Sequence, residues 1–246
     1  MREIYGKARD GLVALWKECR TPAFVAVMVV TAILVTRHYL YGLANYSFPP
    51  WPFGWLGGVV EMFRHPVGQR QVMAFVLQLG VPVLVIWGVH RGRLRDYGLG
   101  LGDTRFWVPV AGLILLVQVV VIWVWLSGDP TYVRRYPSFG LARGGGHAFW
   151  AWEASRLFYM VSWEFLFRGY LLFALERRMG ILAVAVQMVP FAMMHIVSGK
   201  PISEVYFTLL SGVLSGLLVL ICRSVWPMVL IHALGAILLD IFIVYG

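Results

Sequence analysis

The chain has 246 residues, of which 60% are hydrophobic and 13% charged, and its formal net charge is +9. Soluble domains average about 45–50% apolar and 25% charged residues, so this composition excludes an ordinary soluble globular protein. It indicates one membrane-embedded domain over residues 1–246, surrounded by the lipid bilayer. Its basic residues form no clustered face on a soluble module, so no nucleic-acid partner is expected. Cys19 and Cys222 stand far apart, in no metal-binding or redox spacing.

The first 22 residues are predicted to form an amphipathic cytoplasmic segment. They carry too many charges for a secretory signal peptide, and the apolar run that follows is expected to remain as an anchor. Leu12, Val13, Leu15 and Trp16 would face the membrane, while the basic residues would face lipid phosphates.

Seven apolar runs follow, each near the ~20 residues that a helix needs to cross the hydrocarbon core. They are 23–42, 71–90, 106–126, 149–175, 181–197, 205–222 and 226–245. We therefore expect an all-α polytopic membrane helical bundle with about seven transmembrane helices. Segment 43–70 is rich in Pro, Trp and Gly and predicts an interfacial loop, with a re-entrant helix or an eighth span as alternatives. The larger share of Lys and Arg lies on the side of the N-terminus, which favours a cytoplasmic N-terminus in the cell (inner or plasma) membrane.

Ionisable residues inside three apolar spans are the main indication of function. Glu164, His195 and His232 lie on separate predicted helices, where a charge costs at least roughly 2.5–3.5 kcal/mol. Arg168 follows Glu164 by four residues and so shares its helical face. At about 1.5 Å of rise per residue, Glu164 and His195 lie roughly 20 Å from the same membrane boundary and His232 roughly 13 Å. The three helices are therefore predicted to bring these side chains to one site.

Each of these residues also has a purely structural explanation. Glu164 and Arg168 could tie helices together, and a lone histidine such as His195 is more often a packing residue. Glu204 suits the first turn of a helix that follows Pro201, where it would complement the helix dipole. Three costly groups at compatible depth on separate helices nevertheless favour a shared site. Asp240 is either a supporting partner of that site or a residue near the far interface, and Gly169, Gly212 and Gly216 are expected to allow close helix packing.

The order and spacing of these residues resemble a known family. The chain has Trp163-Glu164 followed by Arg168, then Phe191-x-x-x-His195, then His232-x-x-x-Ala236. Residues 149–240 resemble the CAAX-processing and bacteriocin-immunity (CPBP, or Abi) family of intramembrane glutamic endopeptidases. That family carries Glu-Glu-x-x-x-Arg, Phe-x-x-x-His and His-x-x-x-Asn. Two positions depart from its pattern, because Trp163 replaces the first Glu and Ala236 replaces the Asn.

The resemblance implies hydrolysis of a peptide bond in a membrane-associated or lipid-anchored protein. We expect Glu164, beside Arg168, to act as general base on a water that His195 orients, and His232 to donate to the oxyanion. Glu204, in the stretch Gly199-Lys200-Pro201-x-x-Glu204, is the alternative base. Trp163, Phe191, Lys200 and Ala236 are expected to contact substrate. Ser211, Ser215 or Tyr206 would have to replace the donor that the family's Asn provides.

Three other readings stay open at this point. The site could be degenerate, in which case the protein is a membrane adaptor or a bacteriocin-immunity-type binding protein. A transporter would require repeats or paired Gly/Pro interruptions in both halves, and neither is evident. Glu164, His195 and His232 could also hold zinc with an open coordination position. Since the family is regarded as metal-independent, we expect no metal and no other cofactor.

Overall fold

The protein is described by a computed structural model that covers residues 2–43 and 66–246, with side chains described from residue 9 to 39 and from 68 onward. Within these ranges the regular elements are all helical, which confirms the predicted all-α class. Segment 44–65 lies outside the described residues, so the loop or eighth span predicted there stays a prediction. Residues 66–70, which were included in the predicted loop, instead begin a helix.

The helices follow the predicted spans closely. In chain order they are α1 (Arg2–Cys19), α2 (Pro22–Leu43), α4 (Pro66–Phe75), η1 (Val76–Gly80), α5 (Val81–Val85), η2 (Ile86–His90), η3 (Leu94–Tyr97), α6 (Thr104–Val121), η4 (Ile122–Leu126), α7 (Pro130–Arg135), η5 (Gly140–Gly144), α8 (Gly146–Glu164), η6 (Phe165–Leu171), α9 (Leu172–Met179), α10 (Leu182–Val197), α11 (Ile202–Cys222) and α12 (Trp226–Tyr245). In the described part of the chain, six continuous helices are long and apolar enough to cross a membrane, and α10 is a shorter apolar one. The protein is therefore an integral membrane protein with a polytopic helical bundle.

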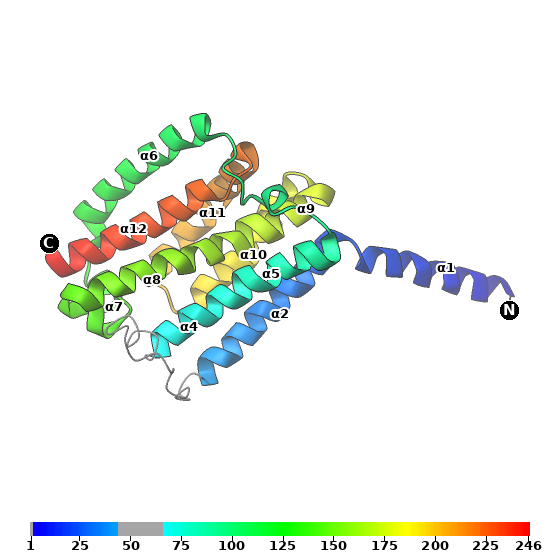
Figure 1. Cartoon of the computed structure of the whole chain (residues 1–246), viewed down its shortest axis with the longest axis horizontal. Helices are drawn as coiled ribbons and strands as arrows, with labels where there is room; N and C mark the ends of the chain where they lie inside the picture. The colour runs from blue at the N-terminus through cyan, green and yellow to red at the C-terminus, as the bar shows by residue number, and fades with distance from the viewer. Residues whose placement is uncertain (1, 44–65) are drawn as a thin grey trace.

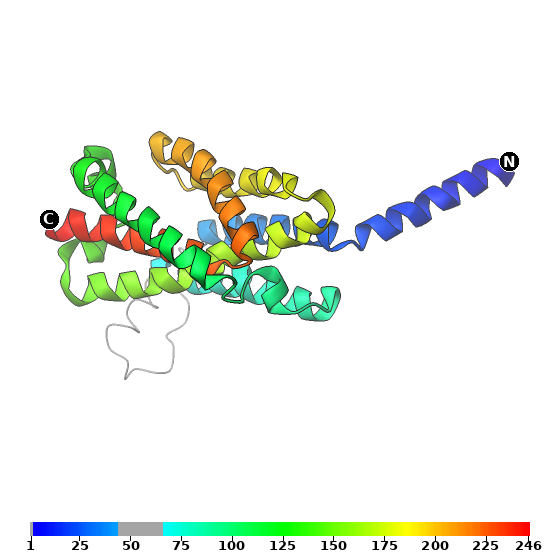
Figure 2. The same ribbon diagram turned by 90° about the horizontal axis from the view of Figure 1, so that it is seen from above.

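The helix formed by α8, η6 and α9 is the centre of the bundle. Its residues 146–179 run without a break, and 78% of its most apolar stretch is buried, against 17% for the span 104–126. Helices α4 and α12 pack against α8, and α10 packs against η6 and α9. Figure 1 shows α12 and α4 on either side of α8, and Figure 2 shows α10 and α11 covering one face of this layer. Side chains of α8 and η6 can therefore meet those of α10, α11 and α12.

A π-helical turn follows directly on Glu164, which the sequence pattern did not reveal. Segment η6 covers residues 165–171 and includes Arg168 and Gly169. A Cβ at Gly169 would lie 2.6 Å from the Phe165 ring and 2.8 Å from the carbonyl oxygen of Tyr97, so only glycine permits this contact with η3. π-helical turns inside α-helices occur frequently at functional sites. The predicted close packing at Gly169 is confirmed, as it is at Gly216, where a Cβ would lie 2.8 Å from Val184 of α10.

Helix α1 extends away from the bundle (Figure 1). An ion pair between Arg178 and Glu18 joins its C-terminal end to α9. Leu12, Leu15 and Trp16 are exposed, with 60–67% of their surface accessible. The segment predicted to be amphipathic is helical in the structure, and its attachment to the inner membrane surface stays a prediction.

The connections between spans gather at two ends of the bundle, as alternation of the spans requires. Arg95, Arg177 and Arg223 line one cavity, although they come from three different connections. The segments 131–143 and 199–201 line a second cavity, formed by connections that alternation places at the other end. The cytoplasmic assignment of the first end, and hence of the N-terminus, remains a prediction from the charge distribution.

Candidate active site

Glu164 and Arg168 form a buried ion pair in the middle of the central helix. The Glu164 carboxylate lies 2.5 Å from the Arg168 guanidinium, and the two side chains are 0% and 2% exposed. Arg168 also donates through Nε to Ser215 Oγ of α11 at 3.0 Å, and its guanidinium lies 4.0 Å from the Phe191 ring centre. The guanidinium thus fixes the carboxylate and ties α8 to α10 and α11. Removing one member of such a pair leaves an uncompensated buried charge.

His232 reaches the same carboxylate from α12. Its Nδ1 lies 2.7 Å from Glu164 Oε1, while Arg168 occupies Oε2. Because a carboxylate oxygen accepts, Nδ1 of His232 carries the hydrogen and donates it. The side chain of His232 is 29% exposed, whereas that of Glu164 is fully buried. Both Glu164 oxygens are therefore engaged, and His232 is the member of this group that reaches outward.

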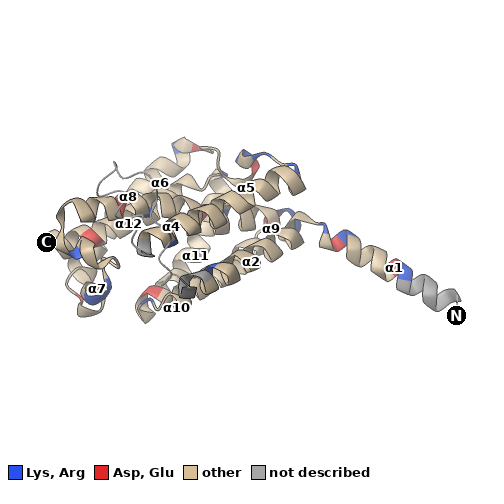
Figure 3. Ribbon diagram, turned by 60° about the horizontal axis from the view of Figure 1, so that its bottom comes forward, with Lys and Arg blue, Asp and Glu red and all other residues tan. Residues whose placement is uncertain are grey.

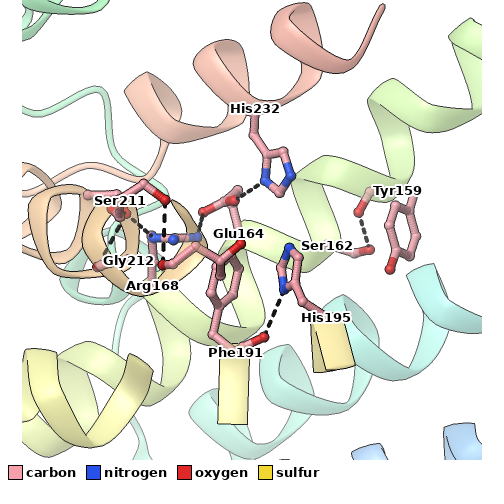
Figure 4. Close-up of polar contacts among 11 residues, drawn as sticks. Tyr159, Ser162, Glu164, Arg168, Phe191, His195, Ser211, Gly212 and His232 are labelled. Carbon is pink, nitrogen blue, oxygen red and sulfur yellow. Dashed lines mark hydrogen bonds and ion pairs between the residues drawn. The ribbon is translucent and has the colours of Figure 1, made fainter. Parts of the chain in front are cut away.

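His195 completes the group from α10. It is 7% exposed, and its Nδ1 lies 3.0 Å from the backbone oxygen of Phe191, one turn earlier on the helix. A carbonyl can only accept, so Nδ1 bears the hydrogen and Nε2 keeps a free lone pair. Figure 4 shows the other nitrogen of His195 directed toward the His232 ring. Glu164, His195 and His232 therefore lie together in the structure, as the depth calculation predicted from the sequence.

Trp163 forms the wall beside His195. It is 4% exposed, and its ring lies edge-on to His195 with centroids 6.0 Å apart. It also packs on Phe167 and Phe191, and the Arg37 guanidinium lies 5.0 Å from its ring centre. Its indole Nε1 is buried with no hydrogen-bond partner among the described residues. An aromatic donor therefore stands where the resembling family has a carboxylate.

Ala236 lies one turn after His232 on α12 and is half-buried. Of the three residues considered as replacements for the family's Asn, Ser215 is occupied by Arg168 and by the carbonyl oxygens of Ser211 and Gly212. Ser211 donates weakly to the Thr208 carbonyl at 3.5 Å, and Tyr206 is 68% exposed. Among the described contacts, none places any of these three side chains beside His232.

Glu204 and Lys200 form a separate group near the end of α10. Lys200 Nζ lies 2.9 Å from Glu204, and Tyr136 donates to Glu204 at 2.9 Å and contacts Lys200. Burial lowers the pKa of Lys200, an effect that the Glu204 carboxylate opposes. Among the described contacts, neither side chain has a hydrogen bond or ion pair with Glu164, Arg168 or either site histidine. The Lys200 backbone N–H does bond to the His195 carbonyl at 3.1 Å.

A second buried ionic group lies on α8 and α12, the two helices that carry Glu164 and His232. Arg156 of α8 is paired with Glu153 at 3.5 Å and with Asp240 of α12, and Trp152 Nε1 donates to Asp240 at 3.2 Å. Asp240, left open between two roles in the sequence, is thus a fully buried partner of this second group. Glu153 and Arg156 were overlooked, although two charges at i and i+3 inside an apolar span were a usable signal.

The zinc alternative can be compared with the placement of its proposed ligands. Among the described residues, no group of three His, Cys, Asp or Glu side chains is arranged to hold a metal ion. The hydrogen bonds agree with this finding, because both Glu164 oxygens already accept hydrogen bonds, one from Arg168 and one from His232. The expectation that no cofactor is needed stays a prediction.

Fold and site together define a polytopic membrane protein with a buried Glu–Arg pair and two convergent histidines. Residues 145–238 match the family model described as Type II CAAX prenyl endopeptidase Rce1-like. The match contains the whole site and confirms the resemblance to CAAX-type membrane proteases that the motifs predicted for residues 149–240. It indicates a hydrolase of the protease class. A comparison with curated proteins and one with solved structures find no match.

Proposed function

We propose that the protein is an intramembrane peptidase that hydrolyses a peptide bond of a membrane-associated or lipid-anchored protein. The observation that carries this proposal is the pairing of two imidazoles from α10 and α12. Each has one ring nitrogen held by an acceptor inside the protein, and Figure 4 shows the other nitrogen of His195 directed toward the His232 ring. The family match supplies the reaction class, because it names an endopeptidase.

The contacts favour a division of roles that differs from the one expected from the sequence. Glu164 is engaged on both oxygens, so we assign it the role of orienting His232 rather than touching water itself. This is the logic of a carboxylate that holds a catalytic histidine in one tautomer and stabilises its protonated form. Arg168 in turn fixes Glu164. Both are positioning residues, while His195 and His232 are the catalytic residues.

The proposed reaction begins with a water hydrogen-bonded to the free nitrogens of His195 and His232. The water oxygen attacks the scissile carbonyl carbon as His232 Nε2 takes its proton, which gives a tetrahedral oxyanion. His232 then returns the proton to the leaving nitrogen as the C–N bond breaks. General acid–base catalysis of this kind contributes typically 10²–10⁴-fold. The unpartnered Trp163 N–H is the donor we assign to the substrate carbonyl side of the site.

The substrate class follows from the position of the site within the bundle. Glu164 and Arg168 are buried inside apolar spans, so a substrate has to reach them from the membrane or its surface. The matching family model names prenyl endopeptidases, which makes prenylated C-terminal peptides the first class to test. Membrane-anchored bacteriocin leaders and C-terminal sorting anchors complete the panel.

The test is a turnover assay in liposomes with that pooled panel of membrane-anchored peptides, analysed by mass spectrometry. Wild type is compared with Glu164→Gln, His195→Ala and His232→Ala, each with and without a chelator. Glu204→Gln serves as the matched carboxylate control, and His147→Ala, at an exposed position, as the matched histidine control. We expect loss of cleavage in the first three variants only, with no effect of the chelator.

Other results would overturn specific parts of the proposal. Loss on chelation would assign the chemistry to a metal. Full activity of Glu164→Gln with loss in Glu204→Gln would move the carboxylate role to Glu204. If folded wild type cleaves no member of the panel, the protein is instead a binding or immunity-type relative.

A further inference from the structure

A basic cavity lies at the end of the bundle where α10 passes into α11. It has a volume of about 620 Å³ and is lined by residues 131–143 on one side and by Gly199 and Pro201 on the other. Arg134, Arg135 and Arg143 face it. Figure 3 shows these basic residues gathered on and after α7. The active-site residues do not line this cavity.

The three arginines carry charge that acidic residues offset only in part, through the attraction between Arg134 and Asp129 at the start of α7. Within the described part of the chain, none of them has a carboxylate within ion-pair distance. Arg143 donates to the backbone oxygens of Val133, Arg134 and Pro137 and so holds the loop in shape. Arg135 donates to the Ser198 carbonyl, but its Nε is buried with no hydrogen-bond partner. The cavity therefore presents fixed positive charge together with an unused buried donor.

The cavity at the other end of the bundle provides a contrast. It is of similar size, about 590 Å³, and is also lined by three arginines, Arg95, Arg177 and Arg223. There, however, Asp96 is part of the lining, and Glu176 pairs with Arg223 at 2.7 and 2.8 Å. Arginines in that cavity are thus partly neutralised from within the chain. Beside α7, by contrast, none of the three arginines has a carboxylate at ion-pair distance among the described residues, which leaves their guanidinium groups available to an anion from outside.

The surrounding aromatic residues show at which depth this anion would lie. Trp123 and Trp125 at the end of the span 104–126, Trp150 in the first turns of α8 and Tyr206 in those of α11 are 56–68% exposed. All four are close in the sequence to the segments that form the cavity. Trp and Tyr gather at the level of the lipid headgroups. An anion at this level is most simply the phosphate of a lipid.

We propose that this cavity binds the phosphate of an anionic phospholipid headgroup through Arg134 and Arg135, with Arg143 holding the loop that presents them. The planar guanidinium fork of arginine matches phosphate oxygens in a bidentate manner. The proposal does not depend on peptidase activity. It also explains why arginines stand at the end of the bundle that the charge distribution assigns to the outside.

The experiment measures binding to the full-length protein in a neutral detergent. Short-chain phosphatidylglycerol, short-chain phosphatidylcholine and inorganic phosphate are titrated separately, with native mass spectrometry and the thermal unfolding temperature as readouts. We expect phosphatidylglycerol to bind and to raise the unfolding temperature, and the other two to do neither. Each lost arginine should weaken binding about fivefold, the effect of one basic residue near an anionic lipid surface.

The variants are Arg134→Gln, whose side chain makes no hydrogen bond or ion pair in the described structure, and the double variant Arg134→Gln/Arg135→Gln. The matched control is Arg93→Gln/Arg105→Gln, which removes the same charge from exposed positions at the other end. Equal weakening by the control would overturn the proposal in favour of general electrostatic attraction. Binding of inorganic phosphate with equal affinity would show a site for free anions instead.

Discussion

The two buried ionic groups of this protein are built on the same pair of helices, yet they differ in how far the residue from α12 is exposed. In both, a Glu–Arg pair on the central helix meets a side chain of α12 (His232 in one, Asp240 in the other). Asp240 is fully buried and forms an ion pair with Arg156. His232 is 29% exposed and keeps a ring nitrogen that Glu164 does not use. On the proposed function, the same framework serves helix cohesion in one place and chemistry in the other, and the residue on α12 distinguishes the two.

The largest effect should come from removing the α12 residue of the active site. His232→Ala leaves Glu164 paired with Arg168, so we expect cleavage to fall by about 10²–10⁴-fold, the usual contribution of a general acid–base residue. The thermal unfolding temperature in detergent should fall less than in a variant that breaks the Glu164–Arg168 pair, because Glu164 keeps Arg168 and loses only the hydrogen bond to its Oε1. A variant that unfolds readily while the remaining folded molecules cleave normally would show that His232 is structural.

The corresponding change in the second group should have the opposite outcome. Asp240→Asn leaves Arg156 with Glu153 at 3.5 Å as its remaining described carboxylate partner. Breaking a buried pair typically costs about 3–5 kcal/mol of folding free energy. We expect a much lower unfolding temperature, with cleavage per folded molecule close to that of wild type. Unchanged stability would contradict the proposed contrast between the two groups.

Gly169→Ala tests the π-helical segment that carries Arg168 of the active site. The added methyl would lie within 2.8 Å of both the Phe165 ring and the Tyr97 carbonyl oxygen. Overpacking of this kind costs typically about 1–3 kcal/mol. We expect lower stability together with reduced cleavage, because η6 also carries Arg168. Gly11→Ala, at a position with open space around the Cβ, is the control for the substitution itself.

The smallest effect is expected from Trp163→Phe, which keeps an aromatic ring but removes the unpartnered indole N–H. The net contribution of a hydrogen bond between neutral groups is about 0.5–1.5 kcal/mol, so the rate of cleavage should fall by roughly tenfold or less. The unfolding temperature should hardly move. An unchanged kcat/KM would remove Trp163 from the proposed oxyanion contacts and leave it as packing beside His195.

The sequence was sufficient for those features that depend on position along a helix. Hydropathy located the spans, and the count of residues from the membrane boundary placed Glu164 and His195 at one depth, with His232 nearer to the boundary but at a compatible depth. It was insufficient for features that depend on how each helix is rotated about its axis. That Asp240 meets Arg156, or that both Glu164 oxygens are occupied, is decided by packing between segments more than 60 residues apart. The π-helical turn at η6 adds an unpredicted change of rotation just after Glu164.

The spacing of the two groups along α8 has a consequence for how this protein can evolve. Eight residues separate Arg156 from Glu164, which is about 12 Å of helix. Substitutions more than 7–10 Å apart and without shared partners usually contribute additively. A change at Trp163, seven residues or about 10 Å of helix from Arg156, is therefore expected to act on the site alone, whereas Ala236 lies only four residues, about 6 Å, from Asp240, so a change there is expected to affect both groups.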